Sequence, residues 1–228
     1  MKFGILVFPG SNCDDDMLYV LRDILNQQVT KIWHKDRDLQ GCEVVVVPGG
    51  FSYGDYLRSG AIARFSPVMQ AVVEHAQRGR YVWGICNGFQ ILTEAGLLDG
   101  ALLKNNHQKY TCKNIYLQVG QTQSALTKQL DPKRPYRIPI AHGDGRFFAS
   151  SDVLKRLEDN DQILFRYCDA QGLLTDESNP NGSTDHIAGI CNKQGNIWGM
   201  MPHPERACDP LLGNTDGRFL FESLLHQL

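Results

Sequence analysis

The chain has 228 residues, of which 42% are hydrophobic, and its 23 lysines and arginines nearly balance 25 aspartates and glutamates. This composition suits one globular domain over residues 1–228 and excludes an intrinsically disordered chain. The formal net charge of −2 gives no electrostatic reason to expect nucleic acid or an anionic membrane as a partner.

The first half of the chain alternates short apolar runs with helical patterns. Continuous runs rich in valine, isoleucine and aromatic residues are typical of buried parallel strands, and they occur at residues 3–8, 43–47 and 80–85. Residues 14–27 and 67–78 carry apolar side chains at helical spacing, with Ser11 or Asn12 as the expected cap of the first helix. This order predicts an α/β fold, a flavodoxin-like three-layer sandwich with a mostly parallel sheet.

The second half of the chain has a different pattern. Strand-like runs follow one another without full helices between most of them, at residues 115–119, 137–141, 162–168, 186–191 and 197–201. We therefore expect antiparallel additions to the sheet, with a hairpin loop at 193–196 and a closing helix at 216–228. Ligands of α/β sheets bind at the carboxyl ends of the strands, which directs attention to the residues that follow 85 and 201.

The run Gly84-Ile85-Cys86-Asn87-Gly88 lies where a strand is expected to end and a helix to begin. Glycines on both sides of a nucleophile at such a junction are typical of a sharp turn that strains the nucleophile's backbone. Amide N–H groups and the helix dipole favour a thiolate there, so Cys86 is a candidate nucleophile whose thiol is expected to point into open space. The alternative is a small buried core cysteine.

A second motif, Met201-Pro202-His203-Pro204-Glu205, follows the apolar run 197–200. Pro204 favours an extended conformation at His203, so the side chains of His203 and Glu205 are expected to project in the same direction. A carboxylate can then orient the imidazole, which is what a cysteine nucleophile needs for proton transfer. A proline-stiffened surface turn is the alternative for this motif taken alone.

A glycine-punctuated loop at residues 48–60 follows the second parallel strand and is expected to line the same crevice as Cys86. The backbone N–H groups of Gly50 and Asn87 are candidate donors to an oxyanion, and a flexible turn is the alternative. Three side chains of this loop are types that anchor protein interfaces, and we take them as candidate partner contacts: Tyr53, Tyr56 and Arg58. The loop matches no phosphate-binding signature, so no nucleotide site is expected.

Three further segments are less specific. The acids at 14–16 lie in the first turn of a predicted helix, where the helix dipole explains them better than a metal cluster does. The glycine-flanked loop 142–146 suggests close approach to another loop or to a partner, which makes His142 and Arg146 candidate interface residues. Residues 179–183 have the composition of a turn.

The spacing of the cysteines and histidines indicates whether the chain binds a metal or forms disulfides, and so which cellular compartment it suits. The seven cysteines include no C-x-x-C pair and the seven histidines no H-E-x-x-H pair, so we expect neither a disulfide framework nor a catalytic metal. Six of the cysteines are interpreted as apolar fillers or incidental thiols. The pattern of a signal peptide and runs of about 20 apolar residues are both lacking, which favours a cytoplasmic enzyme.

Together these motifs resemble the class I, or triad-type, glutamine amidotransferases, and most closely the family of glutaminase subunits of phosphoribosylformylglycinamidine synthase. The matching segments span nearly the whole chain, at residues 8–14, 48–58, 84–90, 179–183 and 199–206. The Phe-Ser-Tyr-Gly-Asp and Pro-His-Pro-Glu-Arg runs are specific to this branch. One loop departs from the family pattern. The family has His-Gly-Glu-Gly-Arg, whereas residues 142–146 of this chain read His-Gly-Asp-Gly-Arg, with an acid one methylene shorter. Whether Asp144 makes an interface contact is therefore left open.

The resemblance implies that Cys86 is the nucleophile, His203 the base and Glu205 the acid that orients it. Gln90, at the family's Cys-x-x-x-Gln position, is similar to a residue that contacts bound glutamine. The implied reaction hydrolyses L-glutamine to glutamate and ammonia through a γ-glutamyl thioester, and ammonia passes to an ATP-dependent synthetase in de novo purine (IMP) biosynthesis. No cofactor is expected in this chain, because ATP and Mg²⁺ belong to the large synthetase subunit. A small third subunit is also expected.

Three alternatives remain open on the sequence alone. A glutaminase subunit of another amidotransferase would share the cysteine, histidine and glutamate, and only the branch-specific loops argue against it. A cysteine hydrolase of the same architecture, acting on peptides or γ-glutamyl compounds, would need no partner. A non-enzymatic binding domain of the same fold would have no need of a correctly placed His203 and Glu205.

Overall fold

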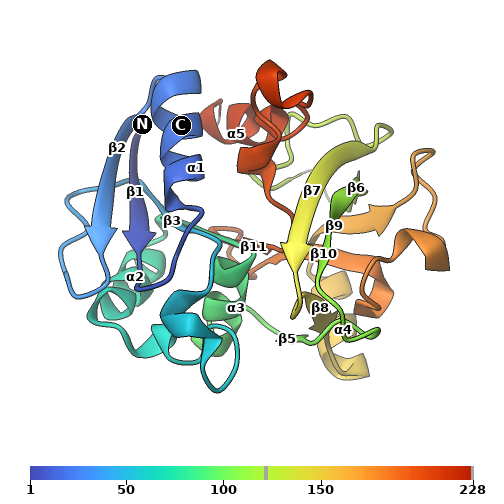
Figure 1. The fold of residues 1–228 in the computed structure, drawn as a ribbon, viewed down its shortest axis with the longest axis horizontal. Coiled ribbons are helices and arrows are strands. Elements are labelled where there is room, and N and C mark those ends of the chain that lie inside the picture. Colours follow the sequence, from blue (N-terminus) through green and yellow to red (C-terminus); the bar gives the residue numbers. More distant parts are fainter. Residues whose placement is uncertain (121–122, 227–228) are drawn as a thin grey trace. The chain divides into compact units, whose positions relative to one another are not determined.

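The computed structural model describes residues 1–120 and 123–226. The chain divides into two compact units (Figure 1). The first unit comprises Met1–Leu98 and Asn196–Gly199. The second comprises Asp99–Gly195 and Met200–Leu228.

The first unit contains a sheet with the strand order β2-β1-β3-β4-β11. Its strands are β1 (Lys2–Val7), β2 (Gln28–Trp33), β3 (Val44–Val47), β4 (Tyr81–Ile85) and the first three residues of β11 (Ile197–Met200). β1 pairs in parallel with β2 and β3, and β3 pairs in parallel with β4. All four valines of β3 are completely buried. The predicted parallel strands are therefore confirmed.

The helices of this unit follow the order expected of a doubly wound fold. They are α1 (Asp14–Tyr19), continued by a π-helical segment (Val20–Ile24), then α2 (Pro67–Gln77) and α3 (Asn87–Glu94). The strand order places β2 on one side of β1 and β4 on the opposite side of β3. Because crossovers between parallel strands are right-handed, α1 and α2 cover opposite faces of the sheet (Figure 1). The flavodoxin-like α/β prediction is thus confirmed for this unit.

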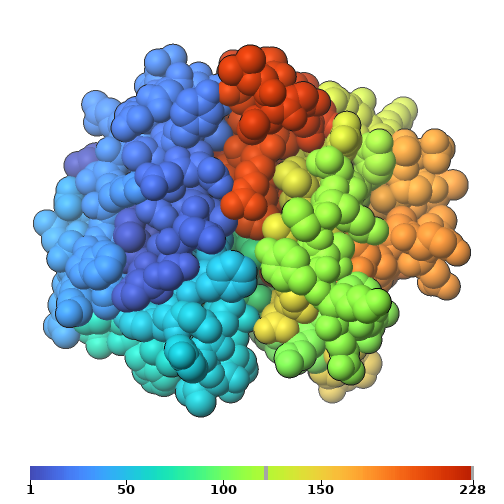
Figure 2. Space-filling model, in the orientation of Figure 1, coloured from blue at the N-terminus to red at the C-terminus, as the bar shows by residue number. Residues whose placement is uncertain are grey.

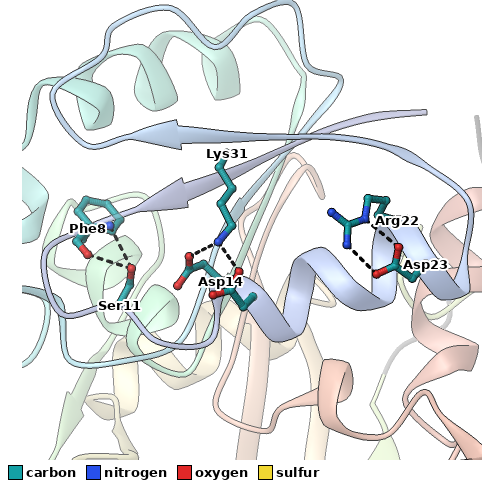
Figure 3. Close-up of polar contacts among 7 residues, drawn as sticks. Phe8, Ser11, Asp14, Arg22, Asp23 and Lys31 are labelled. Carbon is teal, nitrogen blue, oxygen red and sulfur yellow. Dashed lines mark hydrogen bonds and ion pairs between the residues drawn. The ribbon is translucent and has the colours of Figure 1, made fainter.

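Two details at the start of the chain differ from prediction. The strand β2 was not anticipated, because it is an edge strand with a single buried side chain, that of Ile32. The cap residue of α1 is Cys13 and makes no side-chain capping bond, whereas the Ser11 hydroxyl bonds the backbone of Phe8 (Figure 3). The acids of α1 have a structural role, since Lys31 of β2 lies 2.7 Å from an Asp14 oxygen and 2.5 Å from one of Asp15.

The second unit is built around antiparallel strands, as predicted. One sheet has the order β10-β9-β6-β7, formed by β6 (Thr111–Val119), β7 (Tyr136–His142), β9 (Ile163–Cys168) and β10 (Ile187–Cys191). Each neighbouring pair in it is antiparallel. The predicted turn before β11 also forms, and the Gly195 N–H donates to the Asn192 carbonyl at 3.0 Å.

Several short elements of this unit were not predicted. They are the two-stranded sheet of β5 (Ala101–Leu103) and β8 (Arg146–Phe148), and the helix α4 (Ser151–Asp159). The closing helix α5 (Arg218–Leu225) is shorter than the predicted 216–228, of which residues 227 and 228 lie outside the described residues. Short 3-10 turns in the chain are Ser52–Asp55, Ala63–Phe65, Asp176–Ser178, Thr184–His186, Pro204–Arg206 and Pro210–Leu212.

The helices are short throughout. Within residues 1–120 and 123–226, none has the length and apolar character needed to cross a membrane.

Candidate active site

Cys86 occupies the turn between β4 and α3. Its backbone has φ 51° and ψ −107°, which lies outside the regions that non-glycine residues normally adopt. The predicted strained turn is therefore confirmed, and the cysteine precedes the first N–H groups of α3. The side chain is only 6% exposed, so the prediction that the thiol points into open space is wrong.

The flanking glycines permit close backbone packing around this turn. A Cβ added at Gly88 would lie 1.8 Å from the Val47 carbonyl oxygen, at the end of β3. One added at Gly84 would lie 2.6 Å from a methyl carbon of Leu92 and 2.7 Å from the Gly88 carbonyl oxygen. The start of α3 therefore approaches β3 closely enough to exclude any side chain at residue 88.

We expect Gly88→Ala to lower the free energy of unfolding by about 1–3 kcal/mol, because the added carbon meets backbone that cannot move aside. Gly143→Ala is the matched control, since its Cβ would have only an ordinary contact, 3.7 Å from Tyr110. Urea unfolding of both variants measures the difference. Equal stability of the two variants would contradict the packing explanation of Gly88.

The loop after β3 carries Gly50 in a conformation that favours glycine. Its φ is 137°, and a Cβ there would lie 2.7 Å from the Asn12 nitrogen. Two backbone bonds bracket this residue: the Cys13 N–H donates to the Gly49 carbonyl at 3.4 Å, and the Phe51 N–H to the Gly10 carbonyl at 3.0 Å. Neither bond uses the N–H of Gly50, which leaves it suited to the predicted donor role.

The side chain of Asn87 joins this loop to the first turn of α3. Its Oδ1 accepts from the Ser52 N–H at 3.0 Å, and its Nδ2 donates to Asp55 at 3.1 Å and to Gln90 Oε1 at 2.8 Å. Asn87 is completely buried and Gln90 is 5% exposed. The sequence suggested a role for the backbone N–H of Asn87 but gave no signal for its side chain, which fixes both the loop and Gln90.

The three candidate interface residues of the loop lie in different environments. Tyr56 is 74% exposed. The segment around residues 50–65, drawn in cyan in Figure 2, reaches the surface of the first unit. The Arg58 guanidinium is partly exposed and forms a salt bridge with Glu94 at 2.5 Å. The Tyr53 hydroxyl instead points inward, where it contacts His34 and Ser66. Tyr56 is therefore the most accessible of the three.

His203 and Glu205 form a buried pair in the second unit. The His203 backbone has φ −103° and ψ 85°, which avoids the helical region that the following proline disfavours but falls short of the fully extended conformation that was predicted. Its Nδ1 lies 2.6 Å from Glu205 Oε1, and the two residues are 1% and 2% exposed. The His203 N–H also donates to the Pro139 carbonyl of β7 at 2.8 Å. The carboxylate is thus positioned to orient the imidazole through Nδ1.

His142, suggested by sequence as an interface residue, is instead buried, with 3% exposure. Its Nδ1 lies 3.1 Å from Asn105 Oδ1. Burial, with the nearby His203 as a smaller cause, lowers the pKa of His142 to about 4, so its imidazole is neutral near pH 7. Arg146 of the same loop is half-buried, and its guanidinium donates to the Lys104 carbonyl at 3.1 Å.

Two buried asparagines connect three loops around His142. Asn105 donates to the Lys109 and His142 carbonyls at 2.9 and 3.0 Å, and accepts from the Gly145 N–H at 3.2 Å. Asn181 donates to the Gly145 carbonyl at 2.8 Å, and its backbone carbonyl accepts from the Asn106 N–H at 3.0 Å. The loops 104–111, 142–146 and 179–183 therefore share one hydrogen-bond network.

The remaining cysteines differ from Cys86 in their setting. None of the seven cysteines forms a disulfide, and of the other six only Cys112 is exposed. Burial raises the pKa of Cys168 to about 12, and it raises that of Cys208 as well, with the Glu205 carboxylate adding to the effect. Those two thiols stay protonated near neutral pH, which fits the prediction that they are apolar fillers.

The chain belongs to a known enzyme family. Residues 1–218 match the CobB/CobQ-like glutamine amidotransferase domain family, and the match includes both the Cys86 turn and the His203–Glu205 pair. The chain is therefore a glutamine amidotransferase, as predicted from its motifs.

Within this family the similarity extends over the full length. The chain is 55% identical to phosphoribosylformylglycinamidine synthase subunit PurQ of Acaryochloris marina, over all of this chain and 97% of the relative. It is 58% identical to the subunit of the same name from Synechocystis sp., over 97% of this chain and 99% of the relative. A chain in the structure of PurLQS from Thermotoga maritima is 40% identical, with a TM-score of 0.88 over 99% of this chain and 98% of that one. The predicted resemblance to this branch is confirmed.

Proposed function

We propose that residues 1–228 act as one glutamine amidotransferase domain that hydrolyses L-glutamine as the glutaminase subunit of phosphoribosylformylglycinamidine synthase. The observation that carries the proposal is the position of Cys86, held at φ 51° between β4 and α3. A strained cysteine at a helix N-terminus is the arrangement of an activated nucleophile. The full-length identity to PurQ subunits supports the choice of reaction.

In the proposed reaction His203 takes the proton of the Cys86 thiol, and the thiolate attacks the side-chain carboxamide carbon of glutamine. The N–H groups of Gly50 and Asn87 stabilise the oxyanion that forms. The protonated imidazole then gives its proton to the departing nitrogen, which leaves as ammonia, and a γ-glutamyl thioester remains. His203 next removes a proton from water, and the attack of this water on the thioester releases glutamate and restores Cys86.

Three side chains support these steps. Glu205 holds the imidazole and stabilises its positive charge, which the 2.6 Å contact with Nδ1 allows. Gln90 contacts the substrate glutamine from the first turn of α3, where Asn87 fixes its amide. Asn87 also holds Ser52, two residues after Gly50, and so links the donor loop to the helix that follows the nucleophile.

The ammonia is used by a partner. Most ammonia is protonated in water near pH 7 and cannot act as a nucleophile, so we propose transfer by a closed route to an ATP-dependent synthetase subunit that carries ATP and Mg²⁺. The structural relative described as PurLQS supports a synthetase and a small third subunit as partners in purine biosynthesis. Tyr56, Arg58 and Arg146 are the proposed contacts on this chain. Seven cysteines with no disulfide among them suit the cytoplasm as the compartment.

The proposed coupling predicts that glutamine hydrolysis by the isolated chain is slow and rises at least tenfold when the synthetase, ATP and the amide acceptor are added. The reason is that docking on the loop at Tyr56 can stabilise the backbone conformation at Gly50. Glutamate release, measured with each component omitted in turn, tests this expectation. Tyr56→Ala should raise the synthetase concentration needed for half-maximal stimulation, whereas exchange of the exposed Tyr110 for alanine should not.

The same assay separates the alternatives. Stimulation by a different synthetase and acceptor would indicate another amidotransferase, and hydrolysis of peptides without any partner would indicate a cysteine hydrolase. Absence of glutamine hydrolysis under every condition would indicate a binding domain. Equal rates with and without the synthetase would exclude the coupling while leaving the proposed nucleophile in place.

A further inference from the structure

The hydroxyl of Tyr53 lies between two buried polar groups. It is 2.6 Å from Nδ1 of His34 and 2.9 Å from Oγ of Ser66. The rings of Tyr53 and His34 also pack edge to face, with their centroids 5.4 Å apart. Because His34 is 5% exposed and Ser66 is 4% exposed, water competes little for these bonds. The side chain of Tyr53 is thus fixed at its tip.

Both partners of the hydroxyl belong to rigid parts of the first unit. The His34 N–H donates to the Val7 carbonyl of β1 at 2.9 Å, and its carbonyl accepts from the Val68 N–H in the first turn of α2 at 3.1 Å. Ser66 is the cap residue of that helix. Burial, the largest cause, lowers the pKa of His34, so a neutral imidazole is favoured and its Nδ1 can accept from the Tyr53 hydroxyl.

The loop that Tyr53 anchors has an unfavourable backbone. Tyr53, Asp55 and Leu57 have φ values of 56°, 53° and 71°, in the left-handed region that non-glycine residues rarely occupy. Such residues persist only where surrounding contacts hold them. The loop begins at Gly50, and the Tyr53 N–H donates to the Pro9 carbonyl at 2.6 Å. Pro9 belongs to the segment 9–13, whose backbone also bonds the residues on both sides of Gly50. The Tyr53 anchor therefore acts on the backbone beside the proposed oxyanion donor.

We propose that Tyr53 is a positioning residue for catalysis, whose hydroxyl, held by His34 and Ser66, keeps the N–H of Gly50 directed at the oxyanion. This inference rests on the proposed function, since it assumes that Gly50 is an oxyanion donor. It assigns Tyr53 an internal role, in place of the partner contact that the sequence suggested.

The test compares Tyr53→Phe with Tyr81→Phe in the assembled complex with the synthetase. Phenylalanine at residue 53 keeps the ring against His34 and removes only the hydroxyl. Tyr81 is the matched control, a half-buried tyrosine of the same unit whose ring stacks on Trp198 with centroids 4.9 Å apart. We expect Tyr53→Phe to lower kcat for glutamine hydrolysis about tenfold with KM changed less than twofold, and Tyr81→Phe to change neither.

A second readout separates positioning of Gly50 from general damage. Alkylation of Cys86 by iodoacetamide passes through no oxyanion, so its rate, followed by mass spectrometry of the Cys86 peptide, should change less than twofold in Tyr53→Phe. A double variant of Tyr53→Phe and His34→Ala should lose less than the sum of the two single losses, because both single variants remove the same bond between the Tyr53 hydroxyl and the His34 imidazole. Synthesis from ammonium salts should stay at the level of the unaltered complex.

The outcomes that would overturn the inference are distinct. If the alkylation rate of Cys86 in Tyr53→Phe fell by the same factor as kcat, Tyr53 would act on the Cys86 turn as a whole. If Tyr53→Phe and Tyr81→Phe had equal kcat and KM, the Tyr53 hydroxyl would have no role in catalysis. If Tyr53→Phe had a normal kcat at saturating synthetase but bound the synthetase more weakly, Tyr53 would instead be a residue of the partner interface. Failure of the proposed function looks different, since Cys86→Ala would then hydrolyse glutamine normally.

Discussion

Replacing Cys86 by serine or alanine is expected to abolish glutamine-dependent synthesis in the assembled complex while leaving synthesis from added ammonium salts unchanged. The variant lacks only the source of ammonia, because the proposed thioester cannot form without the thiol. We expect the glutamine-dependent rate to fall by at least about 10³-fold. Parallel assays with glutamine and with an ammonium salt, on the same preparation, measure both activities.

The control for this experiment is Cys112→Ser. Cys112 is the one exposed cysteine among the seven, and it lies on β6 in the second unit. Its replacement should leave both activities unchanged. If Cys86→Ser instead reduced both activities equally, the role of Cys86 would extend beyond ammonia production and its assignment as the glutaminase nucleophile would be wrong.

His203→Ala is expected to lower the rate of glutamine hydrolysis by about 10⁴-fold, and Glu205→Ala by about 10–100-fold. Without His203 no group takes the thiol proton or protonates the leaving nitrogen. Without Glu205 the imidazole loses the 2.6 Å contact that orients Nδ1, but it can still act as a weaker base. Initial rates of glutamate release by the assembled complex give the ranking.

An exposed carboxylate provides the comparison for Glu205. Glu177 lies in the 3-10 turn Asp176–Ser178, and its replacement by alanine should not affect hydrolysis. The thermal midpoint of Glu205→Ala should also be measured, because removal of a buried charge partner can unfold a protein. Full activity of a folded Glu205→Ala variant would show that the carboxylate has no part in catalysis.

The features that sequence predicted well depend on contacts close in the chain. The Cys86 turn follows from Gly84 and Gly88, since the space that these glycines need is set by the first turns of α3 and by the adjacent strand β3. The His203–Glu205 pair follows from the proline between them, which fixes its own φ and restricts the backbone of His203. The parallel strands were predicted because a strand buried on both faces, such as β3, has only apolar residues.

The features that sequence reasoning missed depend on partners far along the chain. The edge strand β2 has a mostly exposed, polar pattern, and its register is set by pairing with β1. The helix α4 is short, with a single buried side chain, that of Leu157. Tyr53 resembles an interface residue in composition, and only the approach of His34 and Ser66 from other elements defines its role.

The network of Asn105 and Asn181 constrains how this chain can change in length. Because each asparagine side chain pairs with backbone groups of another loop, an insertion in any of the segments 104–111, 142–146 or 179–183 would separate donors from acceptors in its neighbours as well. Insertions are tolerated where the backbone is exposed and is not hydrogen-bonded to other loops. The turn at 169–174 is a better place in the second unit. The Asp169 side chain makes only local bonds there, a single longer-range bond joins Gln118 Nε2 to the Gly172 carbonyl at 3.2 Å, and Leu173 is 62% exposed. A tag or a second domain is therefore better introduced there than in the three loops around His142.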